Sequence, residues 1–157
     1  MEERKVEFII KVLKTAELSS EDSLLRDAAI NAAKRAYAPY SHFCVGAAAL
    51  LGNGTVVCGS NQENAAYPSG MCAERVALFS AGSSFPDEQV VSMAIVALKD
   101  GCVQLSVSPC GGCRQTMLEA EQRYGRNIRV LLCGKDETIV AFSARDLLPL
   151  CFGKDNL

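Results

Sequence analysis

The sequence predicts an α/β fold in which a mixed β-sheet is sandwiched by helices, a three-layer α/β/α arrangement. Helix-like and strand-like segments alternate in the order strand, helix, hairpin, helix, strand, helix, strand, strand. The segment Val90–Leu98 is rich in β-branched and apolar residues, which indicates a central strand covered on both faces. A chain of 157 residues with 49% hydrophobic residues has the length of one domain and enough apolar side chains for its core.

The first two elements are an edge strand and a helix. Residues Lys5–Leu13 alternate enough between polar and apolar side chains to predict a strand at a sheet edge. Ser19 or Ser20 can cap the helix that follows, in which leucines and alanines recur at helical spacing. Pro39 lacks the backbone N–H that a helix needs, so the helix ends before it.

A hairpin and a second helix come next. Phe43–Leu51 and Thr55–Ser60 are strand-like, and the glycines and asparagine of residues 52–54 readily accept the positive φ angles of a tight turn. Beyond a polar loop, Met71–Ala81 has helical composition, and Gly82 marks its end.

After the central strand, the chain forms a third helix and two short strands. Arg114–Tyr124 is predicted to be helical and to end near Gly125. Ile128–Cys133 and Thr138–Phe142 are strand-like, and Ser143 can cap a brief helix.

Charge and hydropathy exclude several classes of partner. The balance of 16 Lys and Arg against 18 Asp and Glu leaves no basic surface for a nucleic acid polymer or an anionic membrane. No apolar run approaches the roughly 20 residues that cross a bilayer, and the start MEERKVEF lacks the apolar stretch of a signal peptide. We therefore expect a cytoplasmic protein that binds neither nucleic acid nor membrane.

The eight cysteines include a group with the spacing of metal ligands. Cys72 and Glu74 stand at the start of the second helix, and Cys110-x-x-Cys113 follows at the start of the third. Tetrahedral zinc accepts thiolates, and three protein ligands leave the fourth position for water. This pattern therefore predicts a catalytic zinc site formed by Cys72, Cys110 and Cys113.

Other interpretations of these residues stay open. His42, the single histidine, could complete a closed structural site with the three cysteines. The spacing Cys110-x-x-Cys113 also occurs in thiol redox proteins. The remaining cysteines are predicted to be small core residues; they are Cys44, Cys58, Cys102, Cys133 and Cys151.

The sequence resembles the cytidine deaminase family, specifically its small homo-oligomeric type with three cysteine ligands for zinc. Cys72–Ala–Glu74 followed by Pro109–Cys110–Gly–Gly–Cys113 matches the signature of the zinc deaminases. The blocks AYAPYSHFCVGAA, NQENAAYPSGMCAERVAL and LLPLCFG extend the resemblance over about residues 24–153. We therefore expect one catalytic domain, with residues 21–153 as its core and residues 1–20 as an N-terminal extension or edge strand.

The resemblance implies a hydrolase with one zinc ion per chain that deaminates cytidine and deoxycytidine in pyrimidine nucleoside salvage. Deamination needs water added at C4, a proton at N3 and a proton on the departing amine. The resemblance makes Glu74 the proton shuttle rather than a ligand. Three thiolates leave zinc with a formal charge of −1, which the helix N-termini and the guanidinium of Arg75 can offset.

The resemblance also assigns residues to the nucleoside. Asn61 and Glu63 would bind the ribose hydroxyls, Phe43 would form a wall of the base pocket, and the Ala73 backbone would meet the pyrimidine edge. The alternatives are ordinary core packing for Phe43 and loop capping for Asn61 and Glu63. Tyr67 would border the nucleoside or anchor its own loop.

The apolar C-terminal segment is relevant to the assembly of subunits. Phe152 is similar to the C-terminal aromatic residue with which family members complete a neighbouring subunit's pocket; alternatively, it closes its own core. The resemblance thus implies a homotetramer with shared active sites.

Three other functions remain open at this point. The protein could deaminate another cytosine-containing small molecule, such as blasticidin S, because the zinc chemistry would be the same. It could be a zinc-stabilised binding module without turnover, against which Glu74 argues, or a thiol redox protein that uses Cys110 and Cys113.

Overall fold

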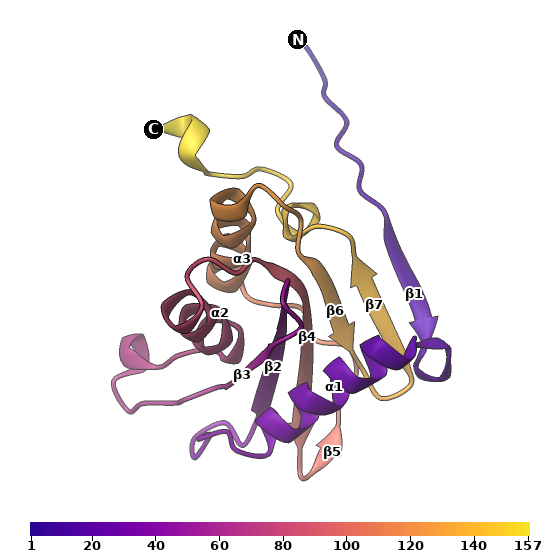
Figure 1. The fold of residues 1–157 in the computed structure, drawn as a ribbon, viewed down its shortest axis with the longest axis vertical. Coiled ribbons are helices and arrows are strands. Elements are labelled where there is room, and N and C mark those ends of the chain that lie inside the picture. The colour runs from indigo at the N-terminus through magenta and orange to yellow at the C-terminus, as the bar shows by residue number, and fades with distance from the viewer.

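The computed structural model of the chain describes residues 1–157 and shows three layers (Figure 1). The mixed sheet has the order β1-β7-β6-β4-β2-β3, with the short β5 paired to β4. Helix α1 packs against one face, and α2 and α3 pack against the other. Adjacent strand residues point to opposite faces, so Ala47 belongs to the hydrophobic cluster under α2 and α3, and Ala48 to the cluster under α1. The predicted fold class is therefore confirmed.

The elements have the following bounds. The strands are β1 (Ile10–Lys14), β2 (Cys44–Leu51), β3 (Val56–Ser60), β4 (Val90–Lys99), β5 (Cys102–Val103), β6 (Arg129–Cys133) and β7 (Glu137–Ala141). The helices are α1 (Ser20–Ala33), α2 (Ala73–Ser84) and α3 (Gly111–Tyr124). Four 3₁₀ turns are η1 (Thr15–Glu17), η2 (Tyr67–Ser69), η3 (Ala144–Leu147) and η4 (Lys154–Asn156). β4 pairs in parallel with β6, and every other strand pair is antiparallel.

The predicted bounds of the edge strand are wrong at its N-terminal end. β1 begins at Ile10, whose partner Ala141 is the last residue of β7. Residues 1–9 lie beyond the end of β7 and therefore have no strand to pair with. The strand itself is at the sheet edge, as expected.

Two glycines allow helices to lie directly on the sheet. A Cβ atom on Gly46 would stand 2.0 Å from the Ala29 carbonyl oxygen of α1, and one on Gly59 would stand 2.4 Å from the Ala73 carbonyl oxygen of α2. Any side chain at Gly59 would thus displace the first turn of α2. This close contact fixes the helix that carries Cys72 at its N-terminus.

The prediction of core cysteines holds for some positions and fails at one. Cys133 is buried, and burial raises the pKa of its thiol to about 11. Burial also raises the pKa of the partly buried Cys58 thiol. Cys44 and Cys151 are partly buried as well, but Cys102 is exposed. Cys102 lies in the two-residue β5, which meets only the end of β4, so no helix covers it.

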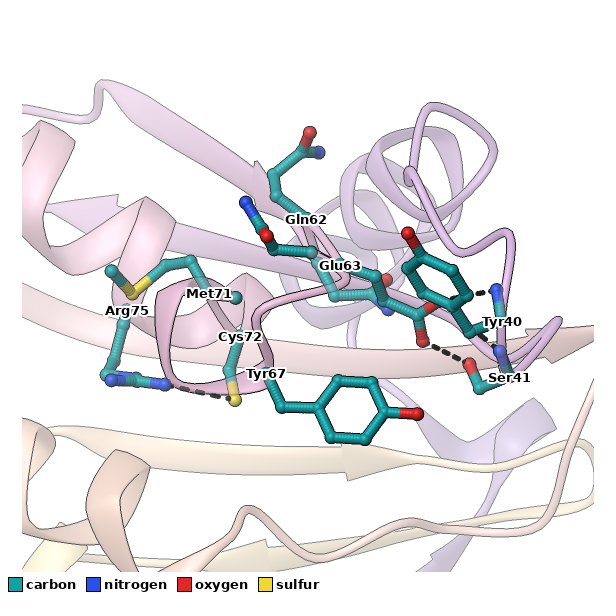
Figure 2. Close-up of a pocket in the computed structure, with 11 residues that line it drawn as sticks. Tyr40, Ser41, Gln62, Glu63, Tyr67, Met71, Cys72 and Arg75 are labelled. Atoms are coloured by element: carbon teal, nitrogen blue, oxygen red, sulfur yellow. Dashed lines mark hydrogen bonds between the residues drawn. The ribbon is translucent and has the colours of Figure 1, made fainter.

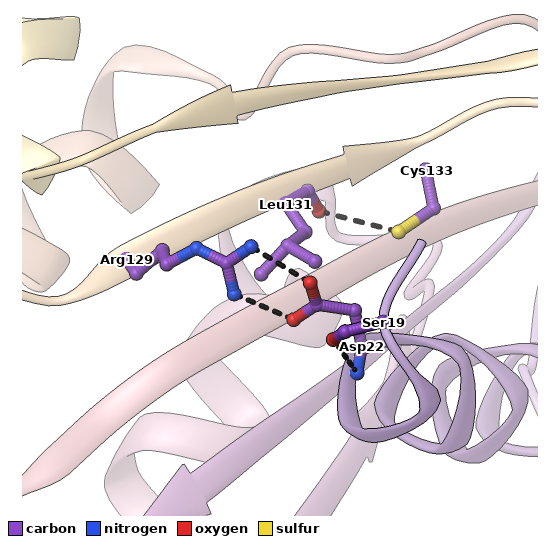
Figure 3. Close-up of polar contacts among 5 residues, drawn as sticks. All are labelled: Ser19, Asp22, Arg129, Leu131 and Cys133. Carbon is purple, nitrogen blue, oxygen red and sulfur yellow. Dashed lines mark hydrogen bonds and ion pairs between the residues drawn. The ribbon is translucent and has the colours of Figure 1, made fainter. Parts of the chain in front are cut away.

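An ion pair joins the start of α1 to the start of β6 (Figure 3). The Arg129 guanidinium donates to both carboxylate oxygens of Asp22, at 2.5 and 2.7 Å. The backbone N–H of Asp22 donates to the Ser19 hydroxyl at 3.1 Å, which caps the helix as predicted. The hydrogen bonds from Arg129 hold the pKa of the buried Asp22 carboxyl below its usual range.

Replacing Asp22 by asparagine should destabilise the fold by about 2 kcal/mol at pH 7, between the values for exposed and buried pairs. Because the folded-state pKa is lowered, this stabilisation is present above the unfolded-state value of about 3.9 and is lost as the pH falls through the folded-state value. Urea unfolding at pH 7 and at acidic pH measures both effects. Asp27→Asn, an exposed position on the same helix, is the control. Equal stability of Asp22→Asn and wild type at pH 7 would contradict the role of the pair.

None of the helices has the length and apolarity that spanning a membrane requires.

Candidate metal centre and adjoining cavity

Three cysteine side chains converge where α2 and α3 begin. Cys72 is the N-cap residue of α2, Cys110 is the N-cap residue of α3, and Cys113 lies in the first turn of α3. Their sulfur atoms all lie within 4.8 Å of one another, and those of Cys110 and Cys113 are 3.5 Å apart. His42 is not in this group. It lies in the loop before β2, with a positive φ of 54°.

The donor set fits a soft divalent metal ion. Tetrahedral zinc with bonds of about 2.3 Å to sulfur would separate its ligand atoms by about 3.8 Å. The separation of 3.5 Å between the Cys110 and Cys113 sulfurs is close to this value, and the limit of 4.8 Å on the other two separations is compatible with it. Thiolate sulfur is also the ligand type that favours zinc over magnesium or calcium.

The thiols at this centre differ in acidity. Burial raises the pKa of the fully buried Cys113 thiol, and the Glu74 carboxylate adds to this effect. Burial opposes ionisation of Cys110 too, but hydrogen bonds from the Cys113 backbone and from neighbouring thiols outweigh it and lower the pKa of that thiol. The electropositive start of α3 thus favours a thiolate at Cys110.

Arg75 contacts one of the three sulfurs, as Figure 2 shows. Its Nη2 donates to Cys72 Sγ at 3.6 Å, and this hydrogen bond raises the pKa of the guanidinium. The buried Nε of Arg75 has no protein partner. The expected contact between Arg75 and a sulfur is therefore present.

Glu74 lies beside the cysteines in a buried position. It is the second residue of α2, and only 5% of it is exposed. It follows Cys72 by two residues, and its charge contributes to the raised pKa of the Cys113 thiol. Ala73, which precedes it, is fully buried. A buried carboxylate beside a metal centre is placed to exchange protons with a molecule bound there.

A cavity of about 500 Å³ lies beside Cys72, and Figure 2 shows the residues that line it. This size is within the range of pockets that hold small molecules. Asn61, Glu63, Tyr67, Cys72 and Arg75 line it, so five of the predicted site residues meet here. Sequence reasoning missed six further lining residues, which are Tyr40, Ser41, Gln62, Asn64, Gly70 and Met71.

Glu63 binds the loop that follows α1. Its carboxylate accepts hydrogen bonds from the backbone N–H groups of Tyr40 and Ser41 at 2.9 and 3.3 Å, and from the Ser41 hydroxyl at 2.5 Å. The hydrogen bond from the Ser41 side chain is the main cause of the lowered pKa of Glu63. Glu63 is thus held ionised at the cavity wall, and it also caps a loop.

Asn61 likewise lines the cavity and binds the backbone of a neighbouring segment. Its Oδ1 accepts from the Val45 backbone N–H at 2.7 Å, and its Nδ2 donates to the Phe43 carbonyl at 3.0 Å. These bonds fasten the end of β3 to the start of β2. The amide keeps a second N–H and a second oxygen lone pair for a ligand.

The three aromatic candidates occupy different environments. Tyr67 is 79% exposed and meets Tyr40 edge to face, with ring centroids 6.5 Å apart. Phe43 is partly buried and does not line the cavity. Phe152 is 60% exposed, while its carbonyl accepts from Gln115 Nε2 at 2.8 Å. The backbone of this tail is therefore held on α3, whereas the aromatic ring lies outside its own core.

Known proteins are similar to this chain in sequence and in fold. Residues 19–125 match the profile of the cytidine and deoxycytidylate deaminase zinc-binding region. A cytidine deaminase of Halalkalibacterium halodurans is 40% identical over 129 residues, which are 82% of this chain and 92% of that protein. One of Mycobacterium tuberculosis is 39% identical over 86% of this chain and 92% of its own length. The crystal structure of cytidine deaminase from Burkholderia pseudomallei superposes with a TM-score of 0.71 at 37% identity, covering 86% of this chain and all of the other.

Proposed function

The chain belongs to the cytidine and deoxycytidylate deaminase family, and on this premise we propose that it hydrolyses cytidine and deoxycytidine. The products are uridine or deoxyuridine and ammonia. The observation that carries this proposal is the group of three cysteines, of which Cys72 also lines a cavity large enough for a small molecule, with the buried Glu74 two residues after Cys72. Relatives that are 39 to 40% identical over most of the chain are named cytidine deaminases, which supports the same substrate.

Cys72, Cys110 and Cys113 would hold one zinc ion per chain. When bound, zinc supplies a Lewis acid that makes a water molecule nucleophilic near neutral pH. The electropositive starts of α2 and α3 and the guanidinium of Arg75 reduce the negative charge that three thiolates create. Arg75 acts here by positioning and neutralising a ligand rather than by touching the substrate.

Glu74 would carry the protons of the reaction. Its carboxylate takes a proton from the attacking water and delivers it to N3 of the base while the bond from oxygen to C4 forms. It then transfers a second proton from the new C4 hydroxyl to the exocyclic nitrogen, the C4–N bond breaks, and ammonia leaves. Burial of this carboxylate excludes bulk water, which would otherwise compete for the same protons.

The cavity wall would recognise the sugar and the base. Glu63, kept ionised by the loop at Ser41, can accept hydrogen bonds from sugar hydroxyls, and Asn61 can donate and accept. Tyr67 is exposed beside the cavity, where its ring can border the nucleoside. We assign the Ala73 backbone to the pyrimidine edge and Phe43 to the wall of the base pocket, in keeping with the family resemblance.

We further assign the activity to pyrimidine nucleoside salvage, with residues 21–153 as the catalytic core. All eight cysteines are free, which supports a reducing compartment such as the cytoplasm.

Metal analysis and a spectroscopic assay of cytidine turnover, done on the same preparation, test the proposed function. We expect one zinc ion per chain together with turnover. Zinc without turnover would indicate a binding module, and a reversible disulfide without zinc would indicate a redox protein. Turnover of blasticidin S in place of cytidine would assign the cavity to another substrate.

We also propose a homotetramer in which Phe152 covers the pocket of a neighbouring subunit. The exposed ring on a well-anchored backbone supports this role, since burial at an interface would provide both association energy and a wall for the base.

Mixed oligomers test this sharing. Phe152→Ala and Glu74→Ala should each be nearly inactive alone, but on co-expression about a quarter of the sites combine both intact residues from different chains. Activity of the mixture should therefore rise to about a quarter of the wild-type value. The two purified variants, combined without exchange of subunits, are the control. If verified mixed oligomers show no gain over this control, Phe152 acts within its own chain.

A further inference from the structure

One edge of the sheet is left open by β1. This strand pairs with β7 on one side only, and residues 1–9 continue from it as an exposed segment (Figure 1). Within this segment, Val6, Glu7 and Phe8 line a cavity with residues 145, 146 and 148–151. An open strand edge presents unpaired N–H and C=O groups, which makes it a template for another strand. The segment lies before residue 19, where the match to the family begins, and contributes no residue to the cysteine group.

From residue 6 to residue 12, the side chains on one face of the chain are all apolar. Val6, Phe8, Ile10 and Val12 alternate with other residues and therefore point to the same face of an extended strand. They are 59, 52, 41 and 55% exposed, respectively. An exposed row of this kind is typical of an interaction surface.

The backbone of β1 is oriented for pairing on its open side. The N–H of Thr15 donates to the Asp136 carbonyl at 2.9 Å, so odd-numbered residues direct their backbone groups toward β7. The backbone groups of Ile10 and Val12 consequently point away from the sheet. If the strand continues toward the N-terminus, those of Val6 and Phe8 do the same.

We propose that this edge pairs antiparallel with the same segment of a second copy of this chain, with Ile9 opposite Ile9 on the two-fold axis. In that register Val6 meets Val12, and Phe8 meets Ile10. The apolar row of one copy therefore continues across the axis into the row of the other. The backbone groups that meet are those already directed outward, and a two-fold axis makes one surface its own complement.

Apolar matching selects this register, and one pair of opposite charges supports it. Glu7 lies opposite Lys11 of the second copy, and symmetry forms this pair twice. At the ends of the paired stretch Arg4 lies opposite Lys14, a repulsive pair. Moving the centre of pairing one residue toward the N-terminus would place Lys5 opposite Lys11, a repulsive pair, and would lose apolar contacts because Val12 would face Arg4. Moving it one residue toward the C-terminus would place Val6 opposite Lys14 and lose an apolar contact.

Neither charge has a stronger partner within its own chain. Glu7 contacts only the exposed Lys5, and Lys11 has no carboxylate partner; its Nζ lies 5.3 Å from the centre of the Phe142 ring. Pairing between copies would thus add ion pairs without breaking a buried one.

Charge reversal tests the proposed register by sedimentation velocity on the zinc-loaded protein. Glu7→Lys and Lys11→Glu should each turn two attractive pairs into repulsive ones, which weakens the association of two copies by about tenfold. The double variant Glu7→Lys/Lys11→Glu restores both pairs and should associate as the wild type does. Cytidine turnover measured on every variant reports whether the rest of the chain is intact.

Disulfide crosslinking tests the position of the two-fold axis. Ile9→Cys should form a disulfide between two copies under mild oxidation, because facing residues of a non-hydrogen-bonded pair come within reach of such a bond. Phe8→Cys is the matched control, since position 8 faces position 10 of the other copy. Equal masses of wild type and both single variants, failure of the double variant to restore association, or crosslinking at position 8 rather than 9 would each overturn the proposal.

Discussion

Glu74→Gln should retain zinc and fold but lose turnover of cytidine by at least 10²- to 10⁴-fold, the range for a positioned general acid and base. Glutamine has the size and hydrogen-bonding shape of the carboxylate but cannot accept and return a proton. Because only 5% of Glu74 is exposed, bulk water cannot readily take its place. Initial rates and zinc content, measured on the same samples, separate proton transfer from metal binding.

Glu21→Gln is the matched control for this variant. Glu21 is the second residue of α1, as Glu74 is the second residue of α2, but it is exposed and distant from the cysteines. Its replacement should leave turnover unchanged. Near-normal turnover in zinc-replete Glu74→Gln would refute the proton shuttle, and loss of zinc would show instead that the carboxylate supports the ligand group.

The metal-binding group could be predicted because its geometry depends on local sequence. Cys72 and Cys110 each stand immediately before a helix, and the period of apolar residues in the sequence locates both helices. The helices begin slightly away from the predicted residues, Ala73 instead of Met71 and Gly111 instead of Arg114, since the cysteines themselves take the N-cap positions. Packing of both helices on one face of the sheet then brings the sulfurs together.

The cavity could be predicted only in part because its walls depend on contacts between distant segments. Tyr40 and Ser41 line it since their backbone N–H groups are bound by Glu63, more than 20 residues later. No local sequence pattern around Tyr40, Ser41 or Glu63 indicates this contact. The positive φ of His42, which helps turn the loop, is equally unforeseen for a residue other than glycine.

Glu121 shows the same limit within a helix. The sequence places it in a polar stretch of α3, yet it is buried. Its carboxylate accepts from the backbone N–H groups of Ile128 and Ala144 and from the Ser143 hydroxyl. These partners compensate the burial of the charge, and they exist only once β6 and η3 are in place.

Cys110→Ser should abolish zinc binding, and with it the turnover of cytidine. Two remaining thiolates cannot supply the three protein ligands that a catalytic zinc site requires, and serine is a poor ligand at neutral pH because its hydroxyl stays protonated. Zinc occupancy should fall below about a tenth of the wild-type value. Cys110 suits this test better than Cys113, since it is exposed, whereas the fully buried Cys113 also fills the core.

The same variant tests whether zinc stabilises the fold. A ligand that binds only the folded state raises its stability, so wild type should melt at a higher temperature with zinc than after chelation. Cys110→Ser should melt like chelated wild type and should not respond to added zinc. Cys58→Ala, which removes a partly buried thiol outside the metal-binding group, should keep full zinc content and its response to chelation. Stoichiometric zinc in Cys110→Ser would show that Cys110 is not a ligand, and zinc lost from Cys58→Ala would show that the site also depends on a thiol outside the three cysteines.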